Sequence, residues 1–354
     1  MHIALAFNLR ESSSSEDEPP SSDDPVPDDL YAEWDDLETI QAVAAALKSK
    51  HEVSLVNADL DAFEKLRALQ PELVFNIAEG LNGASREAQI PALLEMLDLP
   101  YTGSDPATLA ICLDKGRTKE ILTQRRIPTP RFWIIRAIDE LPARLSYPLI
   151  VKPCLEGSSK GVTDKALVKN RKELVTQVEW VLNTYGQRVL IEDFLPGREF
   201  TVAMLGNGET LSVLPIVEID FSTLPGDVNP IYSYEAKWVW DTEQNPLQIF
   251  DCPAQIDPFL AGRIETICRQ AFQALDCRDW CRIDVRLDVS GHPQIIELNP
   301  LPGILPRPEQ NSCFPKAARA AGLSYEQLIL RVADVAIERI FGVQRVDSEN
   351  RCLL

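Results

Sequence analysis

Two short apolar runs late in the chain carry charged and amide side chains at alternate positions. Arg282 and Asp284 lie two residues apart in CRIDVRLD. Glu297 and Asn299 have the same spacing in IIELNP. Residues two apart on a β-strand point to the same face. A two-residue turn at 290–291, within DVSGHP, would make the two runs a hairpin and place Asp284 directly opposite Glu297.

Opposed carboxylates on a hairpin repel each other, so a cation should lie between them. The oxygen atoms of Asp, Glu and Asn side chains suit Mg²⁺ far better than Zn²⁺. The alternative is an ordinary surface hairpin whose charged face is solvated. The other polar segments of the chain have to decide between these two interpretations.

A loop of small residues follows another apolar run. Lys152 ends YPLIVKP, and residues 156–161 read EGSSKG. Small residues allow backbone N–H groups to approach an anion closely, although the spacing matches neither a P-loop nor a dinucleotide-binding motif. Three more lysines, Lys115, Lys119 and Lys237, fall beside similar strand ends. Lysines that converge with such a loop and a carboxylate cluster would bind a polyphosphate. A plain hairpin turn and solvated surface lysines are the alternative.

The segment RVLIEDFLPGREF predicts a strand that ends at Asp193, followed by an aromatic residue and a Pro-Gly turn. A strand edge with free backbone groups beside Phe194 could hold a purine, and Glu199 could bind ribose hydroxyls. The alternative is an ordinary strand and turn between domains. This segment alone does not indicate a nucleotide site.

Composition narrows the function classes. The formal charge is −19, and residues 11–38 hold twelve acids while no Lys or Arg occurs from 11 to 47. This acidity argues against nucleic acid as a partner. No apolar run approaches the ~20 residues of a membrane span, and the start does not resemble a signal peptide. Eight cysteines without a CxxC pair and only three histidines argue against a zinc site and suggest a reducing cytoplasm.

Apolar strand patterns alternate with helical ones in the first third of the chain. The runs HIALAF, HEVSLV and ELVFNIA, with the helix LETIQAVAAALKSK between the first two, predict a parallel sheet with crossover helices. The fold class is therefore α/β in the first unit, followed by α/β or α+β units. The expected divisions are an N-terminal domain over 1–113 with an acidic flexible loop at 11–30, a central unit over 114–196, a C-terminal unit over 197–345 and a tail over 346–354.

The order of these motifs resembles a known family. The segments LDKGRTK, YPLIVKP with EGSSKGV, VLIEDFLPGREFTV, YEAKW, RIDVRLD, IIELNPLPG and FPKAARAAGLSYEQLILR are similar to the ATP-grasp ligases, and most closely to the D-alanine–D-alanine ligases, over about residues 72–340. The resemblance implies a three-domain ATP-grasp fold with an N-terminal parallel-sheet (pre-ATP-grasp) domain. It also implies ATP and two Mg²⁺ ions (or Mn²⁺) as cofactors, amino acids as substrates, a cytoplasmic role in peptidoglycan and cell-wall synthesis, and a homodimer, although the residues alone do not indicate an oligomeric state.

The resemblance assigns roles to residues of this sequence. ATP phosphates would be held by Lys115, Lys152 and Lys237, with a loop of Glu156, Gly157, Ser158 and Ser159 closing over them. The adenine would lie against Glu192, Asp193, Phe194 and Leu195, and the ribose against Glu199. The Mg²⁺ ligands would be Asp284, Glu297 and Asn299. The catalytic residues would be Arg282, Gly303 and Ser158. Arg282 and the backbone N–H of Gly303 would stabilise the tetrahedral intermediate.

The amino-acid sites match the family less closely. The short turn whose glutamate binds the first substrate's ammonium group is replaced by the acidic segment, where Glu33, Asp35 and Asp36 are all candidates. A second family turn, HGxxGEDG, is replaced by EGLNGASREAQ, in which Glu79 and Glu87 are the nearest acids.

Two further departures affect the loop and the second substrate. The family's tyrosine after EAK is Trp238 here, and an indole can donate a hydrogen bond to the loop at Ser158 but cannot accept one. Ser312 matches the residue that holds the second substrate's carboxylate, but LPRPEQ lengthens the loop before it.

The resemblance therefore implies an ATP- and Mg²⁺-dependent carboxylate–amine ligase that forms a dipeptide through an acyl phosphate, with D-alanyl-D-alanine as the expected product. The first alternative is a ligase that joins other amino acids in a specialised pathway. The second is an ATP-binding regulator without activity. The presence of Arg282 with Asp284, Glu297 and Asn299 argues against a regulator, because a pure binding protein needs no oxyanion donor.

Overall fold

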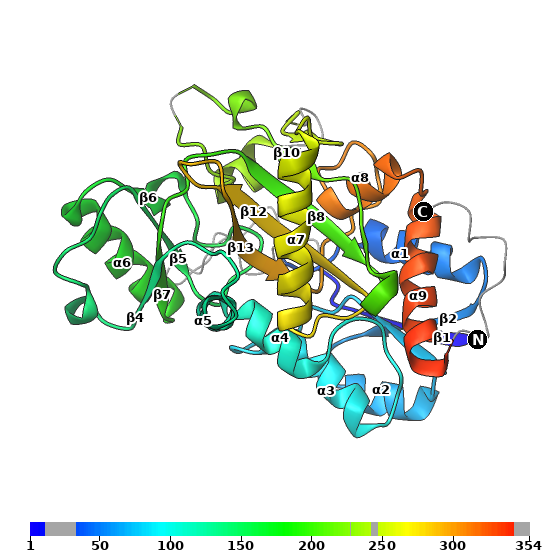
Figure 1. Ribbon diagram of the computed structural model, residues 1–354. Helices are drawn as coiled ribbons and strands as arrows, with labels where there is room; N and C mark the ends of the chain where they lie inside the picture. The colour runs from blue at the N-terminus through cyan, green and yellow to red at the C-terminus, as the bar shows by residue number, and fades with distance from the viewer. Residues whose placement is uncertain (11–32, 227, 242–246, 343–354) are drawn as a thin grey trace.

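The computed structural model describes residues 1–10, 33–226, 228–241 and 247–342. The predicted acidic loop at 11–30 and the tail at 346–354 lie outside these residues. Three β-sheets with helices packed on their faces make up the described part (Figure 1). None of its helices is long and apolar enough to cross a membrane.

The first sheet is parallel, as the alternation of strand and helix patterns predicts. Its strand order is β2-β1-β3, so the chain starts in the centre and adds one strand on each side. Its elements are β1 (His2–Phe7), α1 (Leu37–Lys48), β2 (Glu52–Asn57), α2 (Ala62–Leu69) and β3 (Leu73–Asn76), followed by α3 (Gln89–Met96) and α4 (Pro106–Leu113).

Helix α1 shows how local sequence determines this packing. The Asp36 side chain accepts a hydrogen bond from the Thr39 amide at 2.7 Å and so caps the first turn. Ile40 and Leu47 lie on the buried face of the helix. That face packs against α9 (Tyr325–Phe341), so the beginning and the end of the described chain share one hydrophobic core (Figure 1).

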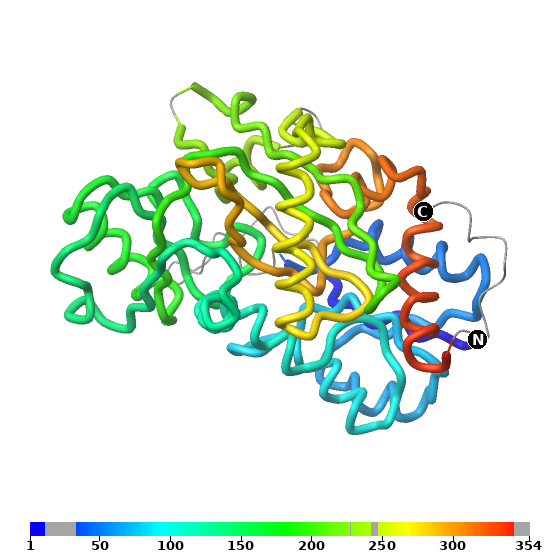
Figure 2. Tube along the Cα trace, viewed as in Figure 1, coloured from blue at the N-terminus to red at the C-terminus, as the bar shows by residue number. Residues whose placement is uncertain are grey.

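The second sheet is antiparallel and stands apart as a lobe on the left of Figure 2. Its strand order is β4-β7-β5-β6, and α6 covers one face with a hydrophobic cluster of its own. The elements are α5 (Lys115–Gln124), β4 (Phe132–Ile135), β5 (Leu149–Pro153), β6 (Leu167–Val168), α6 (Arg171–Tyr185) and β7 (Val189–Asp193).

The third sheet is also antiparallel, with the order β11-β10-β8-β12-β13 and β9 paired to β8. Helix α7 packs across one face, while α8 lies with α9 against the core that reaches the first sheet (Figure 1). The elements are β8 (Glu199–Leu205), β9 (Ser212–Val213), β10 (Val217–Ile219), β11 (Phe250–Asp251), α7 (Pro258–Ala274), β12 (Trp280–Leu287), β13 (Pro293–Asn299) and α8 (Cys313–Ala320).

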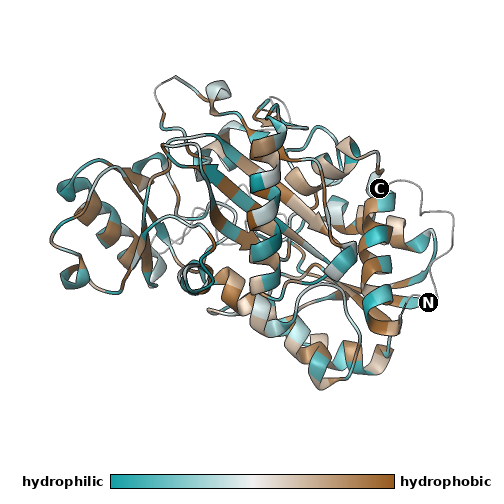
Figure 3. Cartoon of the chain, viewed as in Figure 1, coloured by the Kyte–Doolittle hydropathy of each residue, from teal (hydrophilic) through white to brown (hydrophobic). Residues whose placement is uncertain are grey.

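The hydrophobic clusters follow the sheets more closely than the order of the chain. Hydropathic colouring shows apolar residues concentrated on the strands and on the helix faces turned toward them (Figure 3). Side chains of β1 and β3 share a cluster with α8 and α9. The domain divisions after residues 113 and 196 stay a prediction, because this shared core joins the first and last units.

Strands β12 and β13 form the predicted hairpin. Arg282 pairs with Asn299, and Asp284 pairs with Glu297, in an antiparallel register. The four side chains therefore lie on one face of the third sheet, as their spacing predicts. β12 also pairs with β8, so β12 has a strand on each side, while β13 is the last strand of the described sheet.

The prediction of a two-residue turn in this hairpin is wrong. The Asp288 N–H donates to the His292 carbonyl at 2.9 Å, which leaves three residues in the turn, and Gly291 takes a positive φ of 75° there. The longer turn alone would move the register by one residue. A β-bulge on β13, at Ile296, shifts the pairing back just before Asp284. The bulge thus sets the carboxylates opposite each other.

Candidate active site

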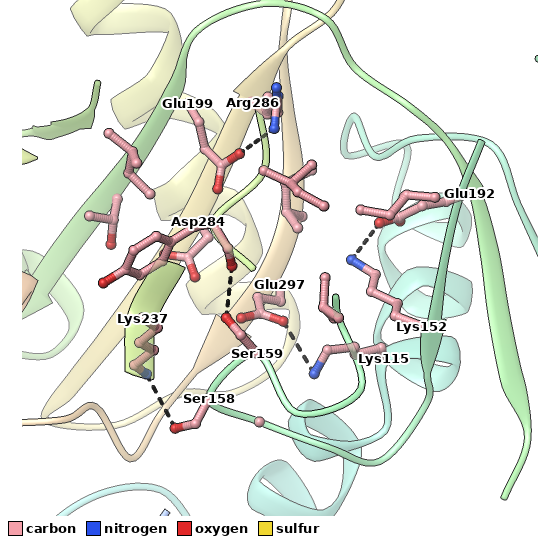
Figure 4. A pocket seen from close by; sticks show the side chains of 18 of the residues that line it. Lys115, Lys152, Ser158, Ser159, Glu192, Glu199, Lys237, Asp284, Arg286 and Glu297 are labelled. Carbon is pink, nitrogen blue, oxygen red and sulfur yellow. Dashed lines mark hydrogen bonds and ion pairs between the residues drawn. The ribbon is translucent and has the colours of Figure 1, made fainter. Parts of the chain in front are cut away.

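Residues far apart in the sequence line one hollow between the second and third sheets (Figure 4). The lysines come from α5, β5 and the helical turn Ala236–Trp240, and the loop follows β5. The carboxylates lie on β7, β8, β12 and β13, with one more on the loop. The predicted residues in its lining are Lys115, Lys152, Glu156, Gly157, Ser158, Ser159, Glu192, Asp193, Phe194, Leu195, Glu199, Lys237, Arg282, Asp284 and Glu297.

Cationic side chains lie between the opposed carboxylates of the hairpin. The Arg282 guanidinium binds both oxygens of Asp284 at 3.1 and 3.0 Å and approaches Glu297 at 3.6 Å. Lys115 Nζ lies 3.2 Å from the other oxygen of Glu297 (Figure 4). Burial acts against ionisation of Glu297, but Lys115, Lys152 and Arg282 outweigh it and lower its pKa. Glu297 is thereby kept ionised.

The second carboxylate responds in the opposite direction. Burial, with repulsion from Glu297, raises the pKa of Asp284 above its ordinary value despite the contact with Arg282. An additional cation beside Asp284 and Glu297 would stabilise the ionised forms of both carboxylates, because a nearby opposite charge favours ionisation.

The donor set fits Mg²⁺. Asp284, Glu297 and Asn299 present hard oxygen atoms on one face, and the Asn299 amide lies 3.4 Å from Glu297 Oε1. Mg²⁺ normally takes one or two carboxylates and completes its shell with phosphate oxygens and water. In the described residues no cluster of three or more His, Cys, Asp or Glu side chains could hold a metal alone. A Mg²⁺ ion at the hairpin would therefore complete its shell with oxygen atoms from phosphate or water.

Glu192 forms the centre of a buried ion triad. Lys152 Nζ lies 2.5 Å from one of its oxygens and Lys119 Nζ lies 2.7 Å from the other. Lys119 is fully buried and also donates to Thr129 Oγ1 at 2.9 Å, so it does not reach the hollow. Burial opposes ionisation of Glu192, but the two lysines lower its pKa. Lys119 therefore positions Glu192 and Lys152 from behind.

Glu199 is held by an arginine that the sequence analysis missed. Arg286 Nη1 lies 2.7 Å from Glu199 Oε2, and the guanidinium is stacked between Phe194 and Phe221, at 4.7 and 4.9 Å from the ring centroids. A further Arg286 hydrogen bond reaches the Pro230 carbonyl at 2.8 Å. The spacing of RIDVRLD carried the signal, because Arg286 lies two residues after Asp284 and shares its face.

The loop over residues 155–161, named the phosphate loop for its predicted role, lines part of the hollow. Ser158 and Ser159 adopt positive φ angles of 49° and 62°, which are costly for residues with a side chain. The contacts that hold them come from elsewhere: Lys237 Nζ lies 3.3 Å from Ser158 Oγ, and Trp238 Nε1 donates to the Ser158 carbonyl at 3.1 Å. Ser159 Oγ donates to the Tyr232 carbonyl at 2.9 Å.

The electrostatics of Lys237 suit a phosphate contact. Burial, reinforced by the positive charge of Arg282, lowers the pKa of Lys237 to about 8. A phosphate group nearby would restore the charge of the lysine, because an opposite charge favours the ionised form.

The candidate residues for the first amino acid have mixed environments. Glu33 forms a two-pronged ion pair with Arg86, at 2.7 to 3.0 Å, and the side chain of Asp36 caps α1. Burial raises the pKa of Asp35 to about 7. Burial with repulsion from Glu87 and Glu33 raises the pKa of Glu79, and burial with repulsion from Glu33 raises the pKa of Glu87 to about 7.

Arg86 is the second functional candidate that the sequence analysis missed. It is the base in EGLNGASREAQ, next to Glu87, but its partner Glu33 lies 53 residues away. Such a long separation leaves no periodic signal in the sequence. The structure shows that Glu33 is engaged in an ion pair and Asp36 in a helix cap, while among the described residues no ion pair within 4.0 Å is found for Glu79 or Glu87.

Ser312 organises the lengthened loop before α8. Its Oγ accepts from the Leu305 amide at 3.2 Å and donates to the Gly303 carbonyl at 3.1 Å. Asn311 ties the same loop to Asp241, at 2.7 Å from the Asn311 amide to Asp241 Oδ2. The segment that carries Gly303 is thus fixed beside the end of β13.

Comparisons with known proteins agree with this architecture. A family described as "D-ala D-ala ligase C-terminus" matches residues 129–334. The chain is 36% identical to "Uncharacterized protein y4sG" of Sinorhizobium fredii, over 87% of this chain and 90% of that one. It is also 36% identical to the "D-alanine--D-alanine ligase" of Bordetella avium, over 78% of this chain and 82% of that one. The D-alanine–D-alanine ligase of Bacillus anthracis, solved with ATP, has a TM-score of 0.70 at 23% identity and covers 96% of this chain and 98% of its own.

The sheets, the loop and the hairpin define the ATP-grasp fold, and that fold class was expected from the order of the motifs. The chain belongs to the D-alanine–D-alanine ligase family.

Proposed function

We propose that this protein is an ATP-dependent D-alanine–D-alanine ligase, which supplies a dipeptide for peptidoglycan synthesis. One observation carries the proposal: the Arg282, Asp284 and Glu297 cluster lies in a single hollow with Lys115 and the phosphate loop. These charged side chains and this loop are suited to phosphoryl transfer followed by amide formation. The Bordetella relatives that bear this name support the choice of substrate.

The first step uses the charged residues around the hollow. A carboxylate oxygen of the first amino acid attacks the γ-phosphorus of ATP, the bond to ADP breaks, and an acyl phosphate forms. Lys115, Lys152 and Lys237 line the hollow and would hold the phosphates. Mg²⁺, or Mn²⁺ with the same ligands, would be held by the hairpin oxygens and would neutralise phosphate charge. The adenine would lie against the 192–195 segment.

The second step needs an oxyanion site. The amine of the second amino acid attacks the acyl carbon, and the negative charge that develops on the carbonyl oxygen requires fixed donors. Arg282 stays charged here, because its attraction to Asp284 and Glu297 overcomes burial and raises its pKa. We assign the second donor to the Gly303 N–H. When the tetrahedral intermediate collapses, the bond between the acyl carbon and the phosphate oxygen breaks. The phosphate that leaves carries one oxygen atom from the carboxylate of the first amino acid.

The remaining roles are assigned as follows. Ser312 would bind the carboxylate of the second amino acid, and Glu79 or Glu87 the ammonium group of the first, because Glu33 is paired with Arg86. The protein would act in the cytoplasm, an assignment that the seven free cysteines in the described chain support. A homodimer stays a prediction.

The experiment is a turnover assay with ATP, Mg²⁺ and a panel of D- and L-amino acids, offered singly and in pairs. Phosphate release and dipeptide are measured together. Turnover with D-alanine alone is the expected result. Turnover only with a different pair would replace the proposal by a ligase of another pathway, and ATP binding without any turnover would replace it by a regulator.

A further inference from the structure

Four charged side chains of alternating sign join the N-terminal unit to the phosphate loop. The Arg86 guanidinium binds Glu33 Oε1 at 2.7 Å and reaches Glu156 Oε2 at 3.4 Å. Lys160 Nζ lies 2.8 Å from the same Glu156 oxygen and 3.8 Å from Glu33 Oε2. Each side chain is almost buried, with exposed fractions of 11% for Arg86, 7% for Glu33, 12% for Glu156 and 7% for Lys160.

Arg86 and Glu33 also form hydrogen bonds with the main chain of the phosphate loop. Arg86 Nη1 donates to the Leu155 carbonyl at 2.8 Å, and the Gly157 N–H donates to Glu33 Oε1 at 2.8 Å. The approach is so close that a Cβ added at Gly157 would lie 2.7 Å from Glu33 Oε1. The first part of the phosphate loop is thus fixed by two residues that belong to the N-terminal unit.

These contacts lie next to the proposed phosphate ligands of the hollow. Lys115 Nζ, one of the proposed phosphate ligands, donates to the Glu156 carbonyl at 2.6 Å. The next residues, Ser158 and Ser159, are held in positive φ by contacts with Lys237 and Tyr232, which lie in the segment between β10 and β11. The phosphate loop is therefore held between this segment and the N-terminal unit, and the Arg86 network supplies the contacts on the N-terminal side.

Charge balance makes Arg86 the central residue. Burial disfavours its charge, but Glu33 and Glu156 raise its pKa, while the pKa of Glu33 is lowered by Arg86 in spite of burial. Removing Arg86 would leave two acids facing each other with Lys160 as the one remaining cation among these four side chains. Breaking one partner out of a buried ion network destabilises what it holds more than a surface pair would.

We propose that Arg86, acting through Glu33 and Glu156, is a positioning residue that holds the phosphate loop over the bound nucleotide and so protects the acyl phosphate from water. This role rests on the proposed ligase function. An open loop would admit water, which attacks the acyl phosphate and returns the free amino acid with phosphate. ATP would then be consumed without dipeptide.

The test combines two readouts on Arg86→Gln, on Arg86→Lys and on a control, Arg269→Gln, which breaks an ion pair with Glu265 on α7. The first readout is the ratio of phosphate released to dipeptide formed. The second is hydrogen exchange of residues 155–161 with a non-hydrolysable ATP analogue bound. It requires no activity and so separates failure of this role from failure of the proposed function.

In Arg86→Gln the ratio of phosphate to dipeptide is expected to rise well above one, and hydrogen exchange in the loop is expected to increase. The kcat for dipeptide formation is expected to fall about 10²-fold, which is the loss typical of a misplaced active-site element. Arg86→Lys is expected to recover part of both effects, and Arg269→Gln neither. Should Arg86→Gln not fold, Glu33→Gln tests the same contacts while keeping an acceptor for the Gly157 N–H. A ratio of one with unchanged loop exchange in the folded variant would overturn the proposal.

Discussion

Replacement of Asp284 by Asn tests the hairpin site with the smallest change of shape. Asp284 binds Arg282 through both oxygens at 3.0 and 3.1 Å and faces Glu297 across the strand pair. The substitution removes one unit of negative charge from the ligands that would hold Mg²⁺. Two unit charges about 4 Å apart attract by ~4 kcal/mol at an effective dielectric constant of about 20, so the cation that neutralises the transferred phosphoryl group would be held more weakly by that amount. Since each 1.36 kcal/mol is tenfold in rate, kcat/KM should fall by about three orders of magnitude.

The same substitution should hardly affect folding. The raised pKa of Asp284, caused by burial and by Glu297, means that its ionised form is disfavoured in the folded state. Asn removes that penalty, and the loss of one ion-pair partner for Arg282 acts against it. We therefore expect a change in the free energy of unfolding within about 1 kcal/mol.

The assay is steady-state dipeptide formation, with urea unfolding measured on the same preparations. Asp251→Asn, at an exposed position on β11 of the same sheet, is the matched control and should retain activity. Unchanged kcat/KM in a folded Asp284→Asn protein would refute the reasoning and remove the carboxylate from the reaction.

Three further predictions concern the rest of the hollow. Arg286→Met should raise the KM for ATP about tenfold with little change in kcat, because Glu199 loses a charged hydrogen bond of ~1.5–3 kcal/mol that orients it toward the ribose; an unchanged KM would separate Glu199 from the nucleotide. Trp238→Phe removes the indole N–H that donates to the Ser158 carbonyl, and the loss of ~1 kcal/mol should lower kcat/KM about fivefold, whereas full activity would show that the contact does not hold the loop. The pKa of Lys237, lowered to about 8, predicts that kcat/KM falls as pH rises through about 8, since the lysine loses its charge there; Lys237→Arg should remain active above that pH, and a pH profile identical to that of the unsubstituted protein would contradict the assignment.

The sequence predicts features that depend on short-range periodicity. The parallel order of the first sheet follows from alternating strand and helix patterns, and the shared face of Asp284 and Glu297 follows from two-residue spacing. The register of the hairpin agrees with the prediction even though the turn is longer, because the bulge at Ile296 compensates for the extra residue. A bulge leaves little trace in the sequence, since Ile296 suits a regular strand equally well.

Contacts between distant segments could not be predicted. Arg86 and Glu33 meet within the N-terminal unit although they lie 53 residues apart, and Arg86 contacts the phosphate loop where the second lobe packs against that unit. Lys119 was grouped with the phosphate lysines, but its helix buries it behind Glu192. Both arrangements depend on tertiary packing, which decides whether a charged side chain reaches the hollow or supports a residue that does.

The central claim is that the substrate carboxylate is activated by transfer of a phosphoryl group, and oxygen labelling tests this most directly. D-alanine with both carboxylate oxygens replaced by ¹⁸O is incubated with the protein, ATP and Mg²⁺, and the released phosphate is analysed by mass spectrometry. The account predicts one ¹⁸O atom in each phosphate molecule formed with the dipeptide. Unlabelled phosphate accompanying dipeptide formation, or no phosphate release that depends on D-alanine, would contradict it.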